Sequence, residues 1–272
     1  MIGVFFFLLG TVIGSFGNVL IYRIPLKQSV VFPASHCTKC GKNLRFYHNI
    51  PIFSWLFLCG KCAFCKNKIS IIYPIIELAS GLLMLLGYIY KYELFNALML
   101  GICFIILLCL GIIDYKLKMV PENLLFFAYI FALLSNYDAN LFISHLKYIS
   151  FYDTYFVDSL ILAGAIVMIK TATSVIKNRG KIDQKVEIMG DADTIIIATI
   201  GAILGIKMGI IAVVLACILM IPFFIYLSLA KKQTDIALPM IPFLFFGLIF
   251  VYLFEDEIRN LISLYYNYIQ NL

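Results

Sequence analysis

Charged residues are scarce in this chain. Only 13% of its 272 residues are Asp, Glu, Lys or Arg, whereas 63% are hydrophobic and the mean hydropathy is +0.99. A soluble domain carries about 25% charged residues, so this composition excludes an ordinary soluble globular protein. The sequence instead predicts an integral membrane protein, in which each spanning helix needs about 20 mostly apolar residues.

Eight hydrophobic segments give the expected fold class, an all-α polytopic membrane protein with about eight transmembrane helices. The segments cover residues 3–22, 72–90, 95–113, 123–136, 157–176, 192–206, 208–230 and 237–254. The sixth and seventh are separated near Gly205 and Gly209. The first lacks an A-x-A-like cleavage site, so we expect a retained helix and not a signal peptide. The expected domains are residues 1–22, 23–71, 72–254 and 255–272.

Acidic residues are absent from residues 23–71, the one sizeable soluble segment. Its basic residues are Arg23, Lys27, Lys39, Lys42, Arg45, Lys61, Lys66 and Lys68. The positive-inside rule therefore places this loop in the cytoplasm and the N-terminus outside it. If the predicted spans alternate from there, the following basic residues also lie on the cytoplasmic side: Lys116, Lys118, Lys177, Arg179, Lys181, Lys185, Lys231 and Lys232. The tail 255–272 and four basic residues then lie on the non-cytoplasmic side: Lys91, Lys147, Lys207 and Arg259. This rule and anionic lipid explain the net charge of +6 without nucleic acid.

The cytoplasmic loop carries two C-x2-C pairs, Cys37–Cys40 and Cys62–Cys65, separated by 21 residues. Two such pairs suit a tetrahedral zinc ion bound by four thiolates, and Gly41 and Asn67 offer the turn that follows each pair. A structural metal would stabilise a loop too short and polar to fold on an apolar core. The cytoplasm disfavours disulfides, although a redox or metal-free thiol cluster stays open, and Cys59 is an alternative ligand.

Two aspartates fall at the same predicted membrane boundary. Asp114 lies at the inner end of the third segment and Asp191 at the inner start of the sixth. A carboxylate at such a boundary is costly, and at a helix C-terminus the helix dipole opposes it as well. If the two meet, one can act as base on a water while the other acts as acid on a carbonyl. The simpler interpretations are a headgroup-facing Asp114 and an Asp191 that caps its helix.

The ordered motifs resemble the type IV prepilin leader peptidases, which are usually also prepilin N-methyltransferases. Residues 14–25 resemble the family's first-helix motif. Residues 33–77, which run from Pro33 through the four cysteines to Glu77, resemble its cytoplasmic domain. The first of the family's two aspartate motifs is similar to Asp114 with Pro121-Glu122. The second is similar to Gly190-Asp191. Three positions depart from the family pattern. Ile188 stands where the family has a glycine, Asp193 stands where it has a lysine, and Cys59 stands where it has an arginine.

The resemblance implies a membrane aspartyl endopeptidase in the inner membrane of a prokaryote. Its catalytic residues would be Asp114 and Asp191, and residues 72–254 would form its peptidase domain. It would cut the basic leader from prepilins or pseudopilins at the cytoplasmic face of the membrane. The hydrophobic helices of these substrates would enter from the lipid bilayer. Glu122 and Asp193 are candidates to receive the leader, although Asp193 also fits a second helix cap.

The resemblance also implies N-methylation of the new N-terminus with S-adenosyl-L-methionine. The residues implicated lie in or next to residues 23–71: Gly60, Lys61 and, as a further candidate, Glu77. No G-x-G-x-x-G fingerprint is present, so the methyl transfer rests on the resemblance alone. Glu77 also fits an interface glutamate that reaches back to water.

Three alternatives stay open. The chain can be a peptidase without methyl transfer, or a proton-coupled transporter, for which it lacks a visible two-fold repeat. A non-enzymatic zinc-ribbon scaffold would tolerate alanine at both aspartates.

Overall fold

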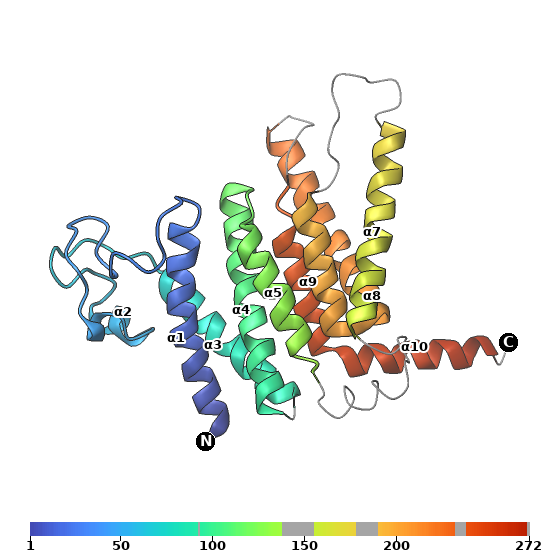
Figure 1. Ribbon diagram of the computed structural model, residues 1–272, viewed down its shortest axis with the longest axis horizontal. Helices are drawn as coiled ribbons and strands as arrows, with labels where there is room; N and C mark the ends of the chain where they lie inside the picture. The colour runs from blue at the N-terminus through green and yellow to red at the C-terminus, as the bar shows by residue number, and fades with distance from the viewer. Residues whose placement is uncertain (92, 138–154, 178–189, 232–237, 271–272) are drawn as a thin grey trace. The chain divides into compact units, whose positions relative to one another are not determined.

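The computed structural model describes residues 1–91, 93–137, 155–177, 190–231 and 238–270. The chain divides into two compact parts, Met1–Tyr137 and Asp138–Leu272. Every longer element in the described ranges is a helix, which confirms the all-α prediction for those ranges (Figure 1). Some residues of the topology prediction lie outside the described residues: Lys147, Arg179, Lys181, Lys185 and Lys232. So does Ile188, which departs from the family's second aspartate motif.

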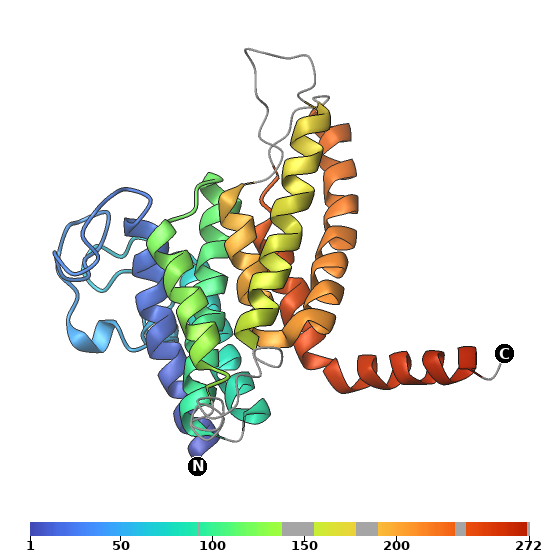
Figure 2. The same ribbon diagram turned by 45° about the vertical axis from the view of Figure 1, so that its right-hand side comes forward.

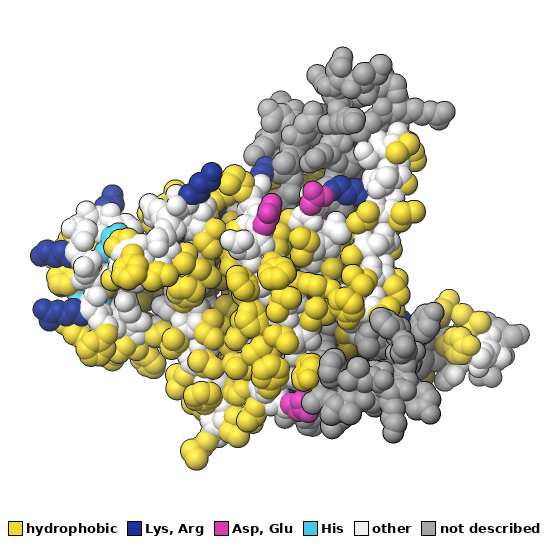
Figure 3. Space-filling model, viewed as in Figure 1, with side chains coloured by type: hydrophobic (Ala, Val, Ile, Leu, Met, Phe, Trp, Pro, Cys, Tyr) yellow, Lys and Arg dark blue, Asp and Glu magenta, His cyan; other side chains and the backbone are white. Residues whose placement is uncertain are grey.

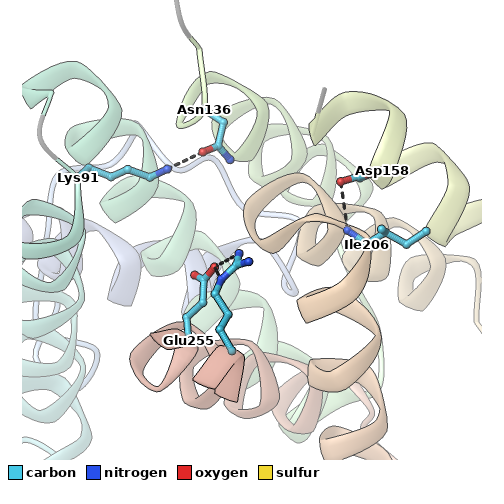
Figure 4. A network of polar contacts seen from close by, with 6 residues as sticks. Lys91, Asn136, Asp158, Ile206 and Glu255 are labelled. Atoms are coloured by element: carbon cyan, nitrogen blue, oxygen red, sulfur yellow. Dashed lines mark hydrogen bonds and ion pairs between the residues drawn. The ribbon is translucent and has the colours of Figure 1, made fainter. Parts of the chain in front are cut away.

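The first part contains four apolar helices, α1 (Ile2–Arg23), α3 (Ile72–Tyr90), α4 (Leu94–Leu117) and α5 (Glu122–Leu134). Glycines let α1 approach its neighbours closely. A Cβ at Gly10 would lie 2.6 Å from the Met84 Cβ of α3, and one at Gly17 would lie 2.9 Å from the Cys109 sulfur of α4. These positions of α1 therefore pack directly against α3 and α4. The Lys91 ammonium, just after α3, donates to the Asn136 side-chain oxygen just after α5 (Figure 4).

The loop between α1 and α3 has little regular structure. It contains a single 3-10 turn, η1 (Phe46–His48), and a short helix, α2 (Phe53–Phe57). The bridges His36–Asn43 and Lys61–Lys68 are isolated. Because so little backbone pairing holds the loop, side chains from α1 and α3 and the cysteine cluster must supply most of its order.

The second part contains α7 (Tyr155–Lys177), α8 (Asp191–Lys231), α9 (Ile241–Leu253) and α10 (Glu255–Gln270). Helix α8 is broken at Gly205, where φ is 74°, a conformation that glycine adopts without strain. The Asp158 carboxylate of α7 accepts the freed N–H of Ile206 at 3.2 Å (Figure 4). The predicted division near Gly205 is confirmed, and Asp158 satisfies a backbone donor that the break exposes.

Every predicted hydrophobic segment coincides with a helix or with one arm of α8. Within the described residues, five helices are long and apolar enough to cross a membrane: α1, α3, α4, α7 and α8. The apolar helices α5 and α9 are shorter, with 13 residues each. Many apolar side chains point outward, such as Met168, which is 73% exposed, and Figure 3 shows charged side chains mainly near helix ends and in the loop.

Candidate functional site

The structure gathers four thiols in the loop between α1 and α3. The ligand atoms of Cys37, Cys40, Cys62 and Cys65 lie within 4.8 Å of one another, and the Cys37 and Cys65 sulfurs are 3.8 Å apart. A tetrahedral zinc ion with Zn–S bonds of about 2.3 Å holds its sulfurs about 3.8 Å apart. The cluster therefore fits a metal ion. Cys59, the alternative ligand, is exposed and is not one of the four grouped thiols.

The two cysteine pairs have the same backbone turn, offset by 25 residues along the chain. In the first pair, the Cys37 N–H donates to the Lys42 carbonyl, and the Cys37 carbonyl accepts the Gly41 N–H. In the second pair, the Cys62 N–H donates to the Asn67 carbonyl, and the Cys62 carbonyl accepts the Lys66 N–H. The turn needs a positive φ directly after the second cysteine. Gly41 supplies it in the first pair and Lys66 (φ 57°) in the second, whereas the predicted turn residue Asn67 contributes the carbonyl that accepts the Cys62 N–H.

The environment of the thiols separates their proton affinities. The backbone N–H groups of Cys40 and Lys39 lower the pKa of Cys37 to about 6. At Cys65 the N–H of Asn67 favours the thiolate, but lost hydration and the neighbouring thiols outweigh it and raise the pKa to about 11. A metal ion would favour the thiolate form of all four, because only thiolates bind it well.

A cavity of about 470 Å³ lies beside the cluster, between the end of α1, the start of α3 and the loop. Glu77, only 8% exposed, is the one acidic residue among the described residues of its wall. Its carboxylate accepts the backbone N–H of Ile52 at 2.7 Å. Ile52 has φ 63°, which is rare for a β-branched residue, so this hydrogen bond holds a strained turn of the loop against α3.

Two polar residues of α1 bind backbone carbonyls beside the cavity, one in α3 and the other in the loop. The Asn18 amide donates to the Tyr73 carbonyl at 3.2 Å, and the Arg23 guanidinium donates to the carbonyls of Ser29 at 3.1 Å and Ala34 at 3.5 Å. Asn18 and Arg23 are 7% and 6% exposed. They therefore position the cavity wall by binding backbone groups within the same part of the chain.

The Trp55 indole forms another wall of the cavity, and its N–H donates to the Ile69 carbonyl at 3.2 Å. Gly60, with φ 66°, packs against this ring, and a Cβ there would lie 2.9 Å from Trp55 Cζ2. Lys61 is exposed and does not line the cavity. The Nδ1 atom of His48, a lining residue, is buried without a hydrogen-bond partner among the described residues.

Asp114 lies in the last turn of α4 and is 7% exposed. Its carbonyl accepts the N–H of Lys118, whose positive φ of 52° ends the helix. Glu122 begins the next helix, α5, and is exposed. The connection between α4 and α5 therefore brings one buried and one accessible acidic residue to the same end of this helix pair.

Asp191 is the first residue of α8, and its side chain is 96% exposed. Lys170 of α7 forms an ion pair with it, which the sequence analysis did not predict. The available signal was a lone lysine inside an otherwise apolar segment, a costly position that usually has a partner. Asp193 lies two residues further along the first turn of α8, so Asp191 and Asp193 belong to one part of the chain and Asp114 to the other.

Two family models match consecutive stretches of the chain. Residues 8–91 match the Bacterial Peptidase A24 N-terminal domain, and residues 100–225 match the Type IV leader peptidase family. The first match contains the cysteine cluster and the cavity, and the second contains both predicted catalytic aspartates. No solved structure matches the chain significantly.

Several curated relatives carry the name prepilin leader peptidase/N-methyltransferase. One from Myxococcus xanthus is 48% identical over 103 residues, which is 37% of this chain and 31% of that protein. One from Pseudomonas putida is 30% identical over 152 residues, covering 47% of this chain and 52% of the relative. One from Vibrio cholerae is 27% identical over 212 residues, covering 75% and 78%. The chain thus spans only about a third and about half of the first two relatives.

Proposed function

The chain belongs to the type IV leader peptidase family, and we propose that it is a membrane aspartyl endopeptidase that cuts the basic leader from prepilins or pseudopilins. The observation that carries the proposal is the matched stretch 100–225. It contains both aspartates, each at one end of a long apolar helix. At these helix ends, the two carboxyl groups would lie at the membrane boundary, where a peptide bond next to a substrate's membrane helix can reach them.

The reaction proposed for Asp114 and Asp191 shares one proton between the two carboxyl groups. The ionised carboxylate takes a proton from a water whose oxygen attacks the scissile carbonyl carbon. The protonated partner donates to the carbonyl oxygen, which gives a tetrahedral intermediate. Collapse of the intermediate breaks the C–N bond, and the leaving nitrogen receives a proton, so the products are a leader carboxylate and a new N-terminal amine.

The acidic residues near the two aspartates have a separate proposed role. The substrate presents a basic leader, and the loop between α1 and α3 is itself basic, so the leader needs acidic partners elsewhere. Glu122 is exposed at the start of α5, and Asp193 lies in the first turn of α8. We assign both to leader binding and not to the chemical step.

The topology proposed is eight spans, with α8 crossing twice. Its apolar stretch, Asp191–Leu229, has 39 residues, or about 58 Å at 1.5 Å per residue, which is close to two bilayer cores of about 30 Å. The basic loop, Asp114 and Asp191 would then lie on the cytoplasmic side and the N-terminus on the other. In the cluster, Cys37, Cys40, Cys62 and Cys65 would hold a structural zinc ion.

Methylation of the new amine is the second proposed activity, and the cavity beside the cysteine cluster is its proposed site. S-adenosyl-L-methionine would supply an electrophilic methyl group there. The residues present fit such a molecule: Trp55 offers a flat ring, Glu77 offers the only carboxylate for a cationic group, and the buried Nδ1 of His48 lacks a partner among the described residues. Gly60 would act by leaving room for Trp55, whereas Lys61, outside the cavity wall, would face the entering substrate.

The test of the peptidase is cleavage of a full-length prepilin by the purified, reconstituted protein, read by intact mass. Asp114→Asn and Asp191→Asn should each remove nearly all cleavage, because the two carboxyl groups act as one unit. Asp193→Asn is the matched comparison and should have a milder effect, because it weakens leader binding and leaves both reacting carboxyl groups in place. Normal turnover in either of the first two variants would refute the proposal, and an inactive Asp193→Asn variant would mean that the second aspartate is misassigned.

A further inference from the structure

Helix α10 (Glu255–Gln270) carries a continuous apolar side that no other described part of the chain covers. It follows the apolar helix α9 after a single residue, Phe254. Its hydrophobic residues recur at helical spacing along one side, which is the pattern of an amphipathic helix. They are Ile258, Leu261, Ile262, Leu264, Tyr265, Tyr266, Tyr268 and Ile269. No residue of α10 is buried, and Leu261 and Tyr265 are 65% and 68% exposed.

The opposite side of α10 is polar and carries little basic charge. It presents Asn260, Ser263, Asn267 and Gln270, and its first turn contains three acidic residues. Arg259, its only basic residue, is paired with Glu255 at 3.0 Å within the helix (Figure 4). The net charge of α10 is thus three acidic against one basic, or −2, so this helix is not attracted to an anionic surface by charge.

The neighbouring helices fix the level at which α10 begins. The break in α8 lies beside the start of α7, because a Cβ at Gly205 would be 3.7 Å from the Tyr155 ring. Helix α9 runs back along the second arm of α8 and ends near this level (Figures 1 and 2). Arg259 in α10 is close enough to Tyr155 to interact electrostatically. The starts of α7 and α10, the α8 break and the end of α9 therefore mark one boundary of this part, opposite the end that carries Asp191.

The direction of α10 also differs from that of the apolar helices in its part. Figures 1 and 2 both show it running crosswise to α7 and α9. A helix that begins where membrane spans end and then turns across them lies along the bilayer surface. Interfacial helices of this kind bury their apolar side about 5–10 Å into the boundary between headgroups and acyl chains. Tyrosine is enriched at that depth, and three of the eight apolar residues of α10 are tyrosines.

We propose that α10 is an interfacial helix whose apolar side binds the headgroup region of the bilayer, at the membrane boundary opposite Asp191. The occupant assigned to this surface is lipid and not a second protein, because α10 follows the apolar helix α9 after one residue, and the exposed side chains of α9, such as Phe246 and Phe250, are apolar as well. Since α10 has a net negative charge, apolar burial drives the contact and anionic lipid adds nothing. The helix would hold the end of α9 at a constant depth.

The experiment uses the full chain reconstituted in phosphatidylcholine vesicles, some containing lipids brominated on the acyl chain near the headgroup. The chain has a single tryptophan, Trp55, so a Trp55→Phe background gives a dark reference. Tyr265→Trp places a probe on the apolar side, and Ser263→Trp is the matched control on the polar side. We expect brominated lipid to quench the first probe strongly and aqueous acrylamide to quench mainly the second, with no change when a fraction of anionic lipid is added.

Equal quenching of both probes by brominated lipid would overturn the proposal, and so would a Tyr265→Trp probe that only acrylamide reaches. A Tyr265→Trp probe shielded from both quenchers would show that protein, such as a second copy of the chain, covers the surface instead. If the Trp55→Phe background does not fold, the same two insertions are made in the wild-type chain, and the quenching of wild type alone is subtracted.

Discussion

The ammonium group of Lys170, on α7, lies 2.5 Å from a carboxylate oxygen of Asp191, the first residue of α8. The Asp191 side chain is 96% exposed and the Lys170 side chain 22% exposed, so the lysine is the more fixed of the two. In the resembled family a lysine follows the second aspartate in sequence, whereas here Asp193 occupies that position and a lysine reaches Asp191 from another helix. The pair therefore orients Asp191 from α7.

Lys170→Met should lower prepilin cleavage by about tenfold or more, because a misplaced catalytic group loses much of its effect. The exposed ion pair itself contributes only about 0–1 kcal/mol, so the thermal unfolding midpoint should change little. Lys170→Arg, which keeps the charge, should restore most of the activity. Full activity in Lys170→Met would show that the pair has no role in catalysis.

The proposed dyad requires the side chains at positions 114 and 191 to meet during the reaction. A chain carrying Asp114→Cys and Asp191→Cys should therefore form a cross-link with a short bifunctional thiol reagent in membranes, detected by mass spectrometry after digestion. Asp114→Cys with Ser263→Cys is the control pair and should not cross-link. Failure of the first pair to react, while each thiol alone is accessible, would contradict the shared-proton mechanism.

The thiols of the metal-free loop should differ in reactivity. With the pKa of Cys37 lowered to about 6 and that of Cys65 raised to about 11, Cys37 is mostly thiolate at pH 7 and Cys65 is not. After chelation, iodoacetamide at pH 7 should therefore modify Cys37 well before Cys65, as read by peptide mass spectrometry. Lowering the pH through about 6 should remove the advantage of Cys37, because its thiolate is then protonated.

One zinc ion per chain should bind the four grouped cysteines and protect all of them from alkylation. Cys59→Ser should keep the metal, whereas Cys62→Ser should lose it, as measured by elemental analysis after purification under reducing, zinc-containing conditions. Because zinc must displace protons from the thiols, the metal should be released as the pH falls. Zinc lost from Cys59→Ser would make Cys59 a ligand.

Glu77 should have two separable roles. Glu77→Gln keeps an oxygen that can accept the Ile52 N–H, so the loop should stay as resistant to proteolysis as in wild type. It removes the one carboxylate among the described residues of the cavity wall, so binding of S-adenosyl-L-methionine, measured by calorimetry, should weaken by tenfold or more, about 1.4 kcal/mol. Glu77→Ala should lose both binding and protease resistance.

Gly60→Val should abolish methylation of a pre-cleaved prepilin while most leader cleavage persists. The valine side chain would displace the Trp55 ring, and the positive φ of Gly60 adds backbone strain. Lys61→Ala should reduce methylation without changing calorimetric binding of S-adenosyl-L-methionine, since Lys61 lies outside the cavity wall. Asp114→Asn should still methylate the pre-cleaved substrate. Loss of both activities in every one of these variants would show that the two sites are not separable.

Local features of the sequence were sufficient to predict the long apolar helices. The third helix of the structure begins and ends at Ile72 and Tyr90, as the apolar run predicted, because helix length in a membrane is set by consecutive apolar residues. The break at Gly205 was equally readable, since glycine lacks the side chain that disfavours a positive φ. The spacing of the four cysteines also predicted their cluster, because each pair folds through its own short-range turn.

The tail after residue 254 shows where this local approach was incomplete. It contains no long apolar run, yet its apolar residues recur with helical period, and the structure has α10 there. The turn after Cys65 shows a related limit: Asn67 takes part in it by accepting the Cys62 N–H, but the positive φ lies at Lys66, which residue preference did not indicate. A one-residue difference of this kind is decided by hydrogen-bond geometry and not by residue preference.

Contacts between distant positions could not be predicted from the sequence. The apolar run predicted that Asp191 would begin a helix, but not that Lys170 would reach it from α7. It identified Glu77 as a candidate, but not that its carboxylate would hold the strained turn at Ile52 or line a cavity with Trp55 and His48. Residue types and short-range periodicity determine helices and turns, because those depend on neighbours in the chain. The cavity and the ion pair depend on how the helices pack. That packing is determined jointly by side-chain volume, glycine contacts and buried hydrogen bonds.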